Sequence, residues 1–294
     1  MPISVPNGTI TFPIFGDSFS LNPSSSFELF GFTVHWYGAI IALGFLLAVI
    51  YTCRRCPDFG LTSDNFIDVL IYAVPAGIVG ARLYYVIFNF SLYRDNLIDI
   101  FKTWNGGMAI YGSIIGAAIA VAIFSKIKKI PMGAILDLGG LGLLIGQTVG
   151  RWGNFINREV YGRKTEIFIR MGLTDTAGNT IYVHPTFLYE SIWNLLGLLI
   201  LHIYSKKGKR RYDGQLFAMY VFWYGIGRML IEGIRSDTLM LFSTGIRVSQ
   251  LLAGLSALAA AVYLFAKSRH PQPEMLVDKQ KRQTAEDTEN EAHT

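Results

Sequence analysis

The stretch TVHWYGAIIALGFLLAVIYTC, residues 33–53, decides the fold class of this chain. It is a predominantly apolar run that ends directly before the basic pair Arg54 and Arg55. A helix needs about 20 apolar residues to cross the hydrocarbon core of a bilayer. This run therefore predicts a membrane-spanning helix with a positively charged end.

Further runs of the same kind follow along the chain. They cover residues 66–88, 107–125, 131–150, 187–204, 215–234 and 246–266. The 294 residues are 51% hydrophobic and 16% charged, which is too little charge to cover the surface of a soluble domain. The sequence predicts an all-α integral membrane protein in which residues 33–266 form about seven transmembrane helices.

Basic residues collect in short clusters at the ends of these runs. The clusters follow the first, third, fifth and seventh runs: Arg54 and Arg55; Lys126, Lys128 and Lys129; Lys206 to Arg211; Lys267 and Arg269. With an odd number of spans all of them lie on one side, which the positive-inside rule assigns to the cytoplasm. We expect the N-terminus outside and the C-terminus inside. The net charge of +5 thus reflects topology, and nucleic acid is not an expected partner.

Three segments lie outside the predicted spans. Residues 1–32 form an extracytoplasmic arm, and residues 267–294, polar and without aromatics, predict a disordered cytoplasmic tail. The longest outer loop, residues 152–186, contains two β-prone runs, Thr165–Leu173 and Thr180–Val183, which flank TDTAGN. Because Asp, Gly and Asn favour turns, we expect a β-hairpin in a small extracytoplasmic head.

The sixth run carries a charged stripe. Tyr224, Arg228, Glu232 and Arg235 are spaced by four, four and three residues, which places them along one helix face. An arginine at the centre of a membrane helix costs at least about 2.5 kcal/mol on insertion scales. The stripe is therefore either a structural Arg–Glu pair or part of a site for an anionic ligand.

Polar residues of the other runs are expected at the same outer level of the bilayer. They are His35, Trp36, Tyr37, Arg82, Tyr111, Gln147, Arg151 and Glu190. Their convergence from separate helices favours an active site, although any single member, such as His35 or Glu190, is also explained as a supporting residue. Several arginines at this level suggest a phospholipid substrate, because guanidinium groups match phosphate oxygens in bidentate fashion.

The segment GRWGNFINREVYG, residues 150–162, closely resembles the GR-x-GNFIN-x-E-x-x-G signature of the prolipoprotein diacylglyceryl transferases. Supporting segments occur in the family's order: HWYG at 35–38, G-x-R-x-x-Y-V at 80–86, WNGGM at 104–108, HPT-x-LYE at 184–190 and YG-x-x-R-x-x-x-E-x-x-R at 224–235. The resemblance covers nearly the whole chain from about residue 30 to 266. Its implied topology agrees with the charge pattern.

The resemblance implies an enzyme of the bacterial cell membrane that needs no cofactor. It would transfer the diacylglyceryl group of phosphatidylglycerol to the lipobox cysteine thiol of a prolipoprotein signal peptide, releasing glycerol phosphate and forming a thioether. This is the first step of lipoprotein maturation.

The resemblance also assigns roles to residues. Arg151 would bind the head group, and Tyr37, His35 and Arg82 are further substrate-binding candidates. The signature loop would be shaped by Asn154, Asn157, Glu159 and Gly162, and the reaction centre lined by Tyr224, Arg228, Glu232 and Arg235. Some relatives have His in GGM-x-x-HG where this chain has Tyr111 in GGMAIYG, so the identity of the general base stays open. A tyrosine with a pKa near 10 is a poor base but can orient a head group or relay a proton.

Other functional classes of membrane protein fit these patterns less well. A transporter or channel also carries intramembrane charge, but an odd span count and a site confined to the outer half argue against alternating access. A seven-helix photoreceptor needs a Schiff-base lysine in its last span, and residues 246–266 contain none. A CDP-alcohol phosphotransferase needs an Asp-rich metal motif, which is also missing. The pair Cys53 and Cys56 is too small a set for a zinc site.

Overall fold

The computed structural model describes residues 8–16, 19–175, 177–235 and 247–292. The chain divides into two compact units. The first consists of Met1–Tyr51, Gly139–Arg210 and Gln215–Gln272, and the second of Thr52–Leu138, Arg211–Gly214 and Pro273–Thr294.

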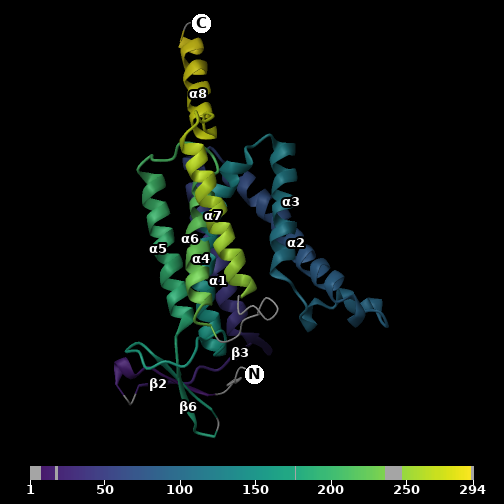
Figure 1. Ribbon diagram of the computed structural model, residues 1–294. Coiled ribbons are helices and arrows are strands. Elements are labelled where there is room, and N and C mark those ends of the chain that lie inside the picture. The colour runs from purple at the N-terminus through teal and green to yellow at the C-terminus, as the bar shows by residue number, and fades with distance from the viewer. Residues whose placement is uncertain (1–7, 17–18, 176, 236–246, 293–294) are drawn as a thin grey trace. The chain divides into compact units, whose positions relative to one another are not determined.

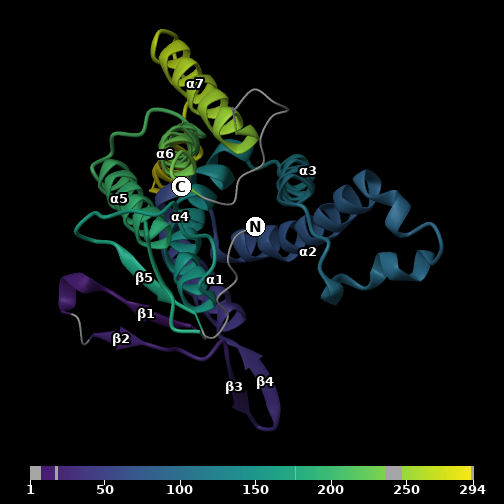
Figure 2. The same ribbon diagram turned by 60° about the horizontal axis from the view of Figure 1, so that its bottom comes forward.

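Long helices occupy all seven predicted apolar runs (Figures 1 and 2). They are α1 (Trp36–Arg55), α2 (Ser63–Phe88), α3 (Ile110–Lys128), α4 (Met132–Asn157), α5 (Thr186–Lys206), α6 (Gln215–Glu232) and α7 (Val248–Ser268). Among the described helices, six are long and apolar enough to cross a membrane. The exception, α6, has 18 residues and includes Arg228 and Glu232, so charge lowers its hydropathy. The predicted integral membrane protein is confirmed.

Glycines allow the helices to approach closely. In the second unit α2 and α3 cross where a Cβ on Gly112 would lie 2.2 Å from the carbonyl oxygen of Gly80. In the first unit α6 and α7 meet where a Cβ on Gly225 would lie 2.7 Å from the carbonyl oxygen of Ala253. Small residues bring membrane helices into backbone contact, and these crossings use that device.

A small β-sheet covers one end of the first unit (Figure 2). Its strand order is β2-β1-β5-β6, built from β1 (Thr9–Thr11), β2 (Ser20–Leu21), β5 (Met171–Thr174) and β6 (Thr180–Val183). The predicted hairpin is present as β5 and β6, and the carboxylate of Asp175 holds its turn by accepting the backbone N–H groups of Ala177 and Asn179. The side-chain amide of Asn179, which also donates to this carboxylate, and these backbone bonds hold the pKa of the Asp175 carboxyl below its usual value.

The N-terminal arm belongs to this head, which the division at residue 32 did not anticipate. Strand β1 pairs with β5, Ile10 lying opposite Leu173. Both side chains are buried in one apolar cluster that also holds Tyr161, Met171, Val183 and Phe187. Two distant segments thus share a core that neither builds alone.

Several boundaries differ from the prediction. Residues 33–35 belong to a second hairpin, β3 (Ser26–Leu29) with β4 (Phe32–His35), so α1 begins at Trp36. Helix α4 continues to Asn157, which makes most of the signature helical and starts the head loop at residue 158. Short 3-10 helices cover Pro13–Phe15, Cys56–Phe59, Phe90–Leu92, Leu97–Phe101 and Thr103–Asn105.

The tail expected to be disordered contains an eighth helix, α8 (Leu276–Ala292). The prediction rested on the polar, aromatic-free composition of the tail and did not consider its helix-favouring Leu, Lys, Gln, Arg and Glu. Within the second unit, the carboxylate of Asp213 accepts the backbone N–H of Leu276, and Gln280 donates to the carbonyl of Gly60. The start of α8 is thereby fixed by contacts that its composition does not show.

Candidate active site

Four charged side chains of the first unit gather around Glu190, near the start of α5. Arg151 of α4 lies 2.5 Å from Glu190 (Nη2 to Oε2), and Arg228 of α6 lies 3.5 Å from it (Nη1 to Oε1). Arg235, just after α6, lies 3.9 Å away. Glu232 lies 2.8 Å from Arg228 and 3.8 Å from Arg235. We call Arg151, Glu190, Arg228, Glu232 and Arg235 the charged cluster.

The carboxylates of the charged cluster are buried, whereas two of its arginines reach the surface. The side chains of Glu190 and Glu232 are 5% and 3% exposed, and those of Arg151 and Arg228 are 21% and 18% exposed. Among the described residues of the charged cluster, three guanidinium groups face two carboxylates, which is an excess of one positive charge. A buried carboxylate needs partners, and the partly accessible cations can in addition meet an anion.

The charged stripe predicted for the sixth run has mixed outcomes. Arg228 and Glu232 do pair at helical spacing, and Arg235 joins them although α6 ends at Glu232. Tyr224 stacks instead on Tyr220, whose hydroxyl accepts the side-chain N–H of Gln147. Polar contacts thus continue from the charged cluster toward the middle of α4 and α6, through Tyr224, Tyr220 and Gln147.

The signature segment forms the edge of the site. Arg151 donates to the side-chain oxygen of Asn154 at 3.3 Å, and Asn154 donates to Glu159 at 2.8 Å. Asn157 lies at 3.5 Å from the same Glu159 oxygen. The three predicted polar residues therefore form one network with Glu159 as its acceptor, and Asn154 connects this network to Arg151.

Gly162 joins this loop to the charged cluster through the backbone. It pairs with Arg235 in an antiparallel bridge, and its N–H donates to the carbonyl of His184 at 2.9 Å. A Cβ at Gly162 would lie 2.6 Å from Cβ of His184, closer than two such atoms approach. A larger residue does not fit at this position without a shift, because the two backbones are in contact.

Arg158, the variable position between Asn157 and Glu159 of the signature, was not among the predicted site residues. Its guanidinium is buried and donates to the carbonyls of Gly8 and Pro23 and to the side chain of Asn22. Arg158 thus holds the N-terminal arm against the signature loop. A buried arginine needs such acceptors. The motif does not specify the residue at position 158, so nothing in the sequence indicated these hydrogen bonds.

The remaining predicted residues lie apart from the charged cluster or in the other unit. The ring of Tyr37 lies against Gly153 of the signature, whereas His35 is exposed on β4. Arg82 is buried in the second unit and donates to the carbonyls of Asp99, Ile100, Gly106 and Gly107. Arg82 thus holds the loop before α3. Tyr111, also in the second unit, is exposed near Tyr84.

Glu190 is central to the charged cluster, whereas the sequence predicted it only as a supporting residue. Its signal was the segment HPT-x-LYE at 184–190, in which Glu190 is the one acidic residue. What raised its importance is contact with three arginines from three different segments.

Comparison with known proteins agrees with the motifs. A family model described as prolipoprotein diacylglyceryl transferase matches residues 24–266. A phosphatidylglycerol–prolipoprotein diacylglyceryl transferase of Streptococcus equi subsp. equi is 41% identical over 255 residues, which is 85% of this chain and 96% of that protein. The enzyme of the same name from Enterococcus faecalis is 42% identical over 255 residues, covering 84% and 91% of the two chains.

Proposed function

The chain belongs to the prolipoprotein diacylglyceryl transferase family, and on that premise we propose how the charged cluster carries out the transfer. The substrates are phosphatidylglycerol and the lipobox cysteine of a prolipoprotein signal peptide. The thiol loses its proton, and its sulfur forms a bond with the glyceryl carbon that bears the phosphate. The carbon–oxygen bond breaks, and its electron pair leaves on the phosphate oxygen. The products are a thioether and glycerol phosphate.

The observation that carries this proposal is the excess of guanidinium groups around Glu190 in a membrane-embedded protein. Arg228 and Arg151 are the two partly exposed cations. We assign Arg151, beside the signature network, to the head group, and Arg228, beside both carboxylates, to the charge that develops on the departing phosphate. An adjacent cation also lowers the pKa of a thiol and raises its thiolate fraction.

The other predicted residues support these two. Glu190, Glu232 and Arg235 orient Arg151 and Arg228, and Asn154, Asn157 and Glu159 shape the edge at which the head group enters. Tyr37 contacts the lipid side, and Tyr224 lines the reaction centre.

The direct test is incubation of the purified protein with phosphatidylglycerol and a lipobox peptide, with and without a chelator. Mass analysis of the peptide should show a diacylglyceryl increment on cysteine in both samples. An unmodified peptide from folded protein would contradict the proposed function, and an increment lost only with chelator would contradict the metal-free scheme.

We further propose that the charged cluster lies at the outer face of the cytoplasmic membrane, with the N-terminus outside. A cysteine placed at Asn179, in the turn between β5 and β6, should react with an impermeant reagent on intact cells. A cysteine at Lys209, between α5 and α6, should react only after permeabilisation. The measurement uses a background in which Cys53 and Cys56 are serine. The opposite labelling would overturn the orientation.

Those native cysteines give a prediction of their own. Cys53 lies 17 residues beyond Trp36 in α1, which is about 25 Å along the helix axis. Because the nucleophile comes from the prolipoprotein, Cys53→Ser with Cys56→Ser should leave the rate of transfer nearly unchanged in the mass assay. Loss of activity from well-expressed protein would instead indicate a covalent enzyme intermediate.

A further inference from the structure

Two tryptophans join α5 and α6 in a reciprocal contact close to the charged cluster. The indole N–H of Trp193 donates to the backbone carbonyl of Trp223 at 3.0 Å, and the indole N–H of Trp223 donates to the carbonyl of Trp193 at 2.9 Å. The two rings stack with their centroids 4.4 Å apart. Each helix therefore gives one donor to the other and accepts one in return.

Each indole reaches its carbonyl over a glycine. A helical carbonyl normally faces the N–H four residues later, and the residues four positions after Trp193 and Trp223 are Gly197 and Gly227. A Cβ on Gly197 would lie 2.5 Å from Nε1 of Trp223, and a Cβ on Gly227 would lie 2.2 Å from Nε1 of Trp193. The segments WNLLG and WYGIG thus form a matched pair of W-x-x-x-G sequences, which we call the indole clamp.

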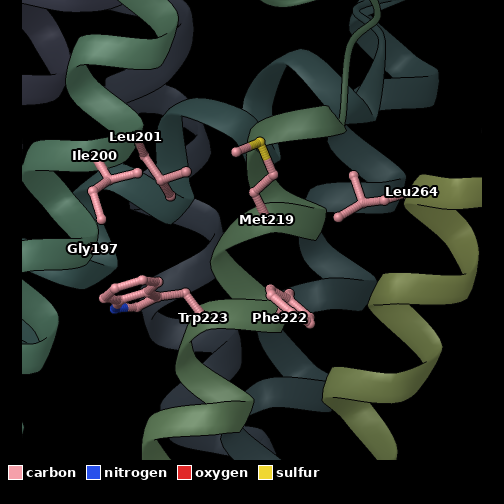
Figure 3. A pocket seen from close by; sticks show the side chains of 7 residues that line it. All are labelled: Gly197, Ile200, Leu201, Met219, Phe222, Trp223 and Leu264. Atoms are coloured by element: carbon pink, nitrogen blue, oxygen red, sulfur yellow. The ribbon is translucent and has the colours of Figure 1, made fainter. Parts of the chain in front are cut away.

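Figure 3 shows the half of the clamp in which Trp223 of α6 lies against α5 at Gly197. The same view shows an apolar cavity of about 270 Å³ that Ile200, Leu201 and Met219 also line. This side of the helix pair offers no polar side chain among the lining residues. In such surroundings an indole N–H has strong need of a carbonyl partner, so the two hydrogen bonds fix how far α5 can slide along α6.

The clamp lies one helical turn from Glu190 on α5. Trp193 follows Glu190 by three residues, which places it on a neighbouring part of the same helix face. On α6, Gly227 directly precedes Arg228. Ser191 donates to the carbonyl of Thr148 at 2.9 Å, which attaches the same turn of α5 to α4. Glu190 is therefore held between a tie to α4 and a tie to α6, the two helices that carry Arg151 and Arg228.

We propose that the indole clamp is a positioning device, which sets the register of α5 so that Glu190 reaches Arg151 and Arg228 together. Trp193 and Trp223 act through Glu190 rather than on the substrate. This inference rests on the proposed function, since it concerns the geometry of the same charged cluster. Its failure is distinguishable, because a protein without transferase activity would show none in the wild-type form either.

The test is a double-mutant cycle between the clamp and Glu190, read as kcat/KM for phosphatidylglycerol. Gly227→Ala should lower kcat/KM by tenfold or more in the wild-type background, on the order of the loss from small misplacements of reacting groups. In a Glu190→Asp background, whose shorter side chain already misses one arginine, the same change should cost only about threefold or less. The matched control is Gly146→Ala in α4, where an added Cβ meets open space. It should leave kcat/KM unchanged in both the wild-type and the Glu190→Asp backgrounds.

Equal losses in both backgrounds would show that the clamp acts only through general stability and would overturn the proposal, as would full activity of Gly227→Ala. If Gly227→Ala fails to fold in detergent, Trp193→Phe keeps the ring, removes one N–H and is judged by the same two ratios. If Glu190→Asp has no measurable turnover, the cycle is read as the shift in melting temperature that phosphatidylglycerol causes. Coupling between the two changes supports the proposal there, and additivity overturns it.

Discussion

Arg228→Lys should lower kcat by roughly a hundredfold or more, the scale seen when one preorganised charge-stabilising donor is removed. Arg228 contacts both buried carboxylates, Glu190 at 3.5 Å and Glu232 at 2.8 Å. Its planar fork spans the two, and an ammonium group on a flexible chain does not reproduce that geometry. The variant should therefore bind phosphatidylglycerol but stabilise the departing phosphate poorly.

Arg151→Lys is the matched comparison for this prediction. Arg151 contacts Glu190 and the signature residue Asn154 but not Glu232 among the described contacts. Its replacement by lysine keeps the attraction for the head group and loses the bidentate fork, so the apparent KM for phosphatidylglycerol should rise while kcat changes less. Steady-state kinetics on both variants, with melting in detergent to show that they fold, makes the comparison. If Arg228→Lys changes only KM, or Arg151→Lys only kcat, the proposed division of roles is wrong.

Gly162→Ala should lower the transferase activity by roughly a hundredfold, because the change displaces the backbone beside the site. The added Cβ would lie 2.6 Å from Cβ of His184 and 3.1 Å from the carbonyl oxygen of Ile234. Neither is the far end of a flexible side chain. The bridge between Gly162 and Arg235 must then open, which moves Arg235 away from Glu190 and Glu232. Overpacking of this kind also costs about 1–3 kcal/mol of stability.

The control for this prediction is Gly139→Ala, at a helical glycine of α4 whose Cβ would meet nothing within 4 Å. It should retain activity and melting temperature in detergent. The mass assay on both variants gives the comparison. Near-normal transfer by Gly162→Ala would show that the bridge to Arg235 is not needed for the reaction.

The sequence by itself determined the membrane-embedded helices and which residue types the site contains. Apolar runs long enough to cross a bilayer leave the chain few alternatives, because an unpaired backbone in hydrocarbon is costly. Charges inside such runs are equally informative, since Arg228 and Glu232 are expensive there without a partner or a ligand. The signature at 150–162 identified the chemistry through residues that lie close together in the chain.

The tertiary structure decided which of these residues meet. No spacing rule joins Glu190 to Arg151 and Arg228, because the three belong to different helices and their contact depends on how α4, α5 and α6 pack. Tertiary packing also decided the place of the N-terminal arm, whose Ile10 is buried in the same apolar cluster as Leu173. The indole clamp depends on two tryptophans that lie 30 residues apart in the chain and on one glycine in each of the two helices. Periodicity reports the face of one helix, whereas the register between two helices is set by contacts that exist only after they pack.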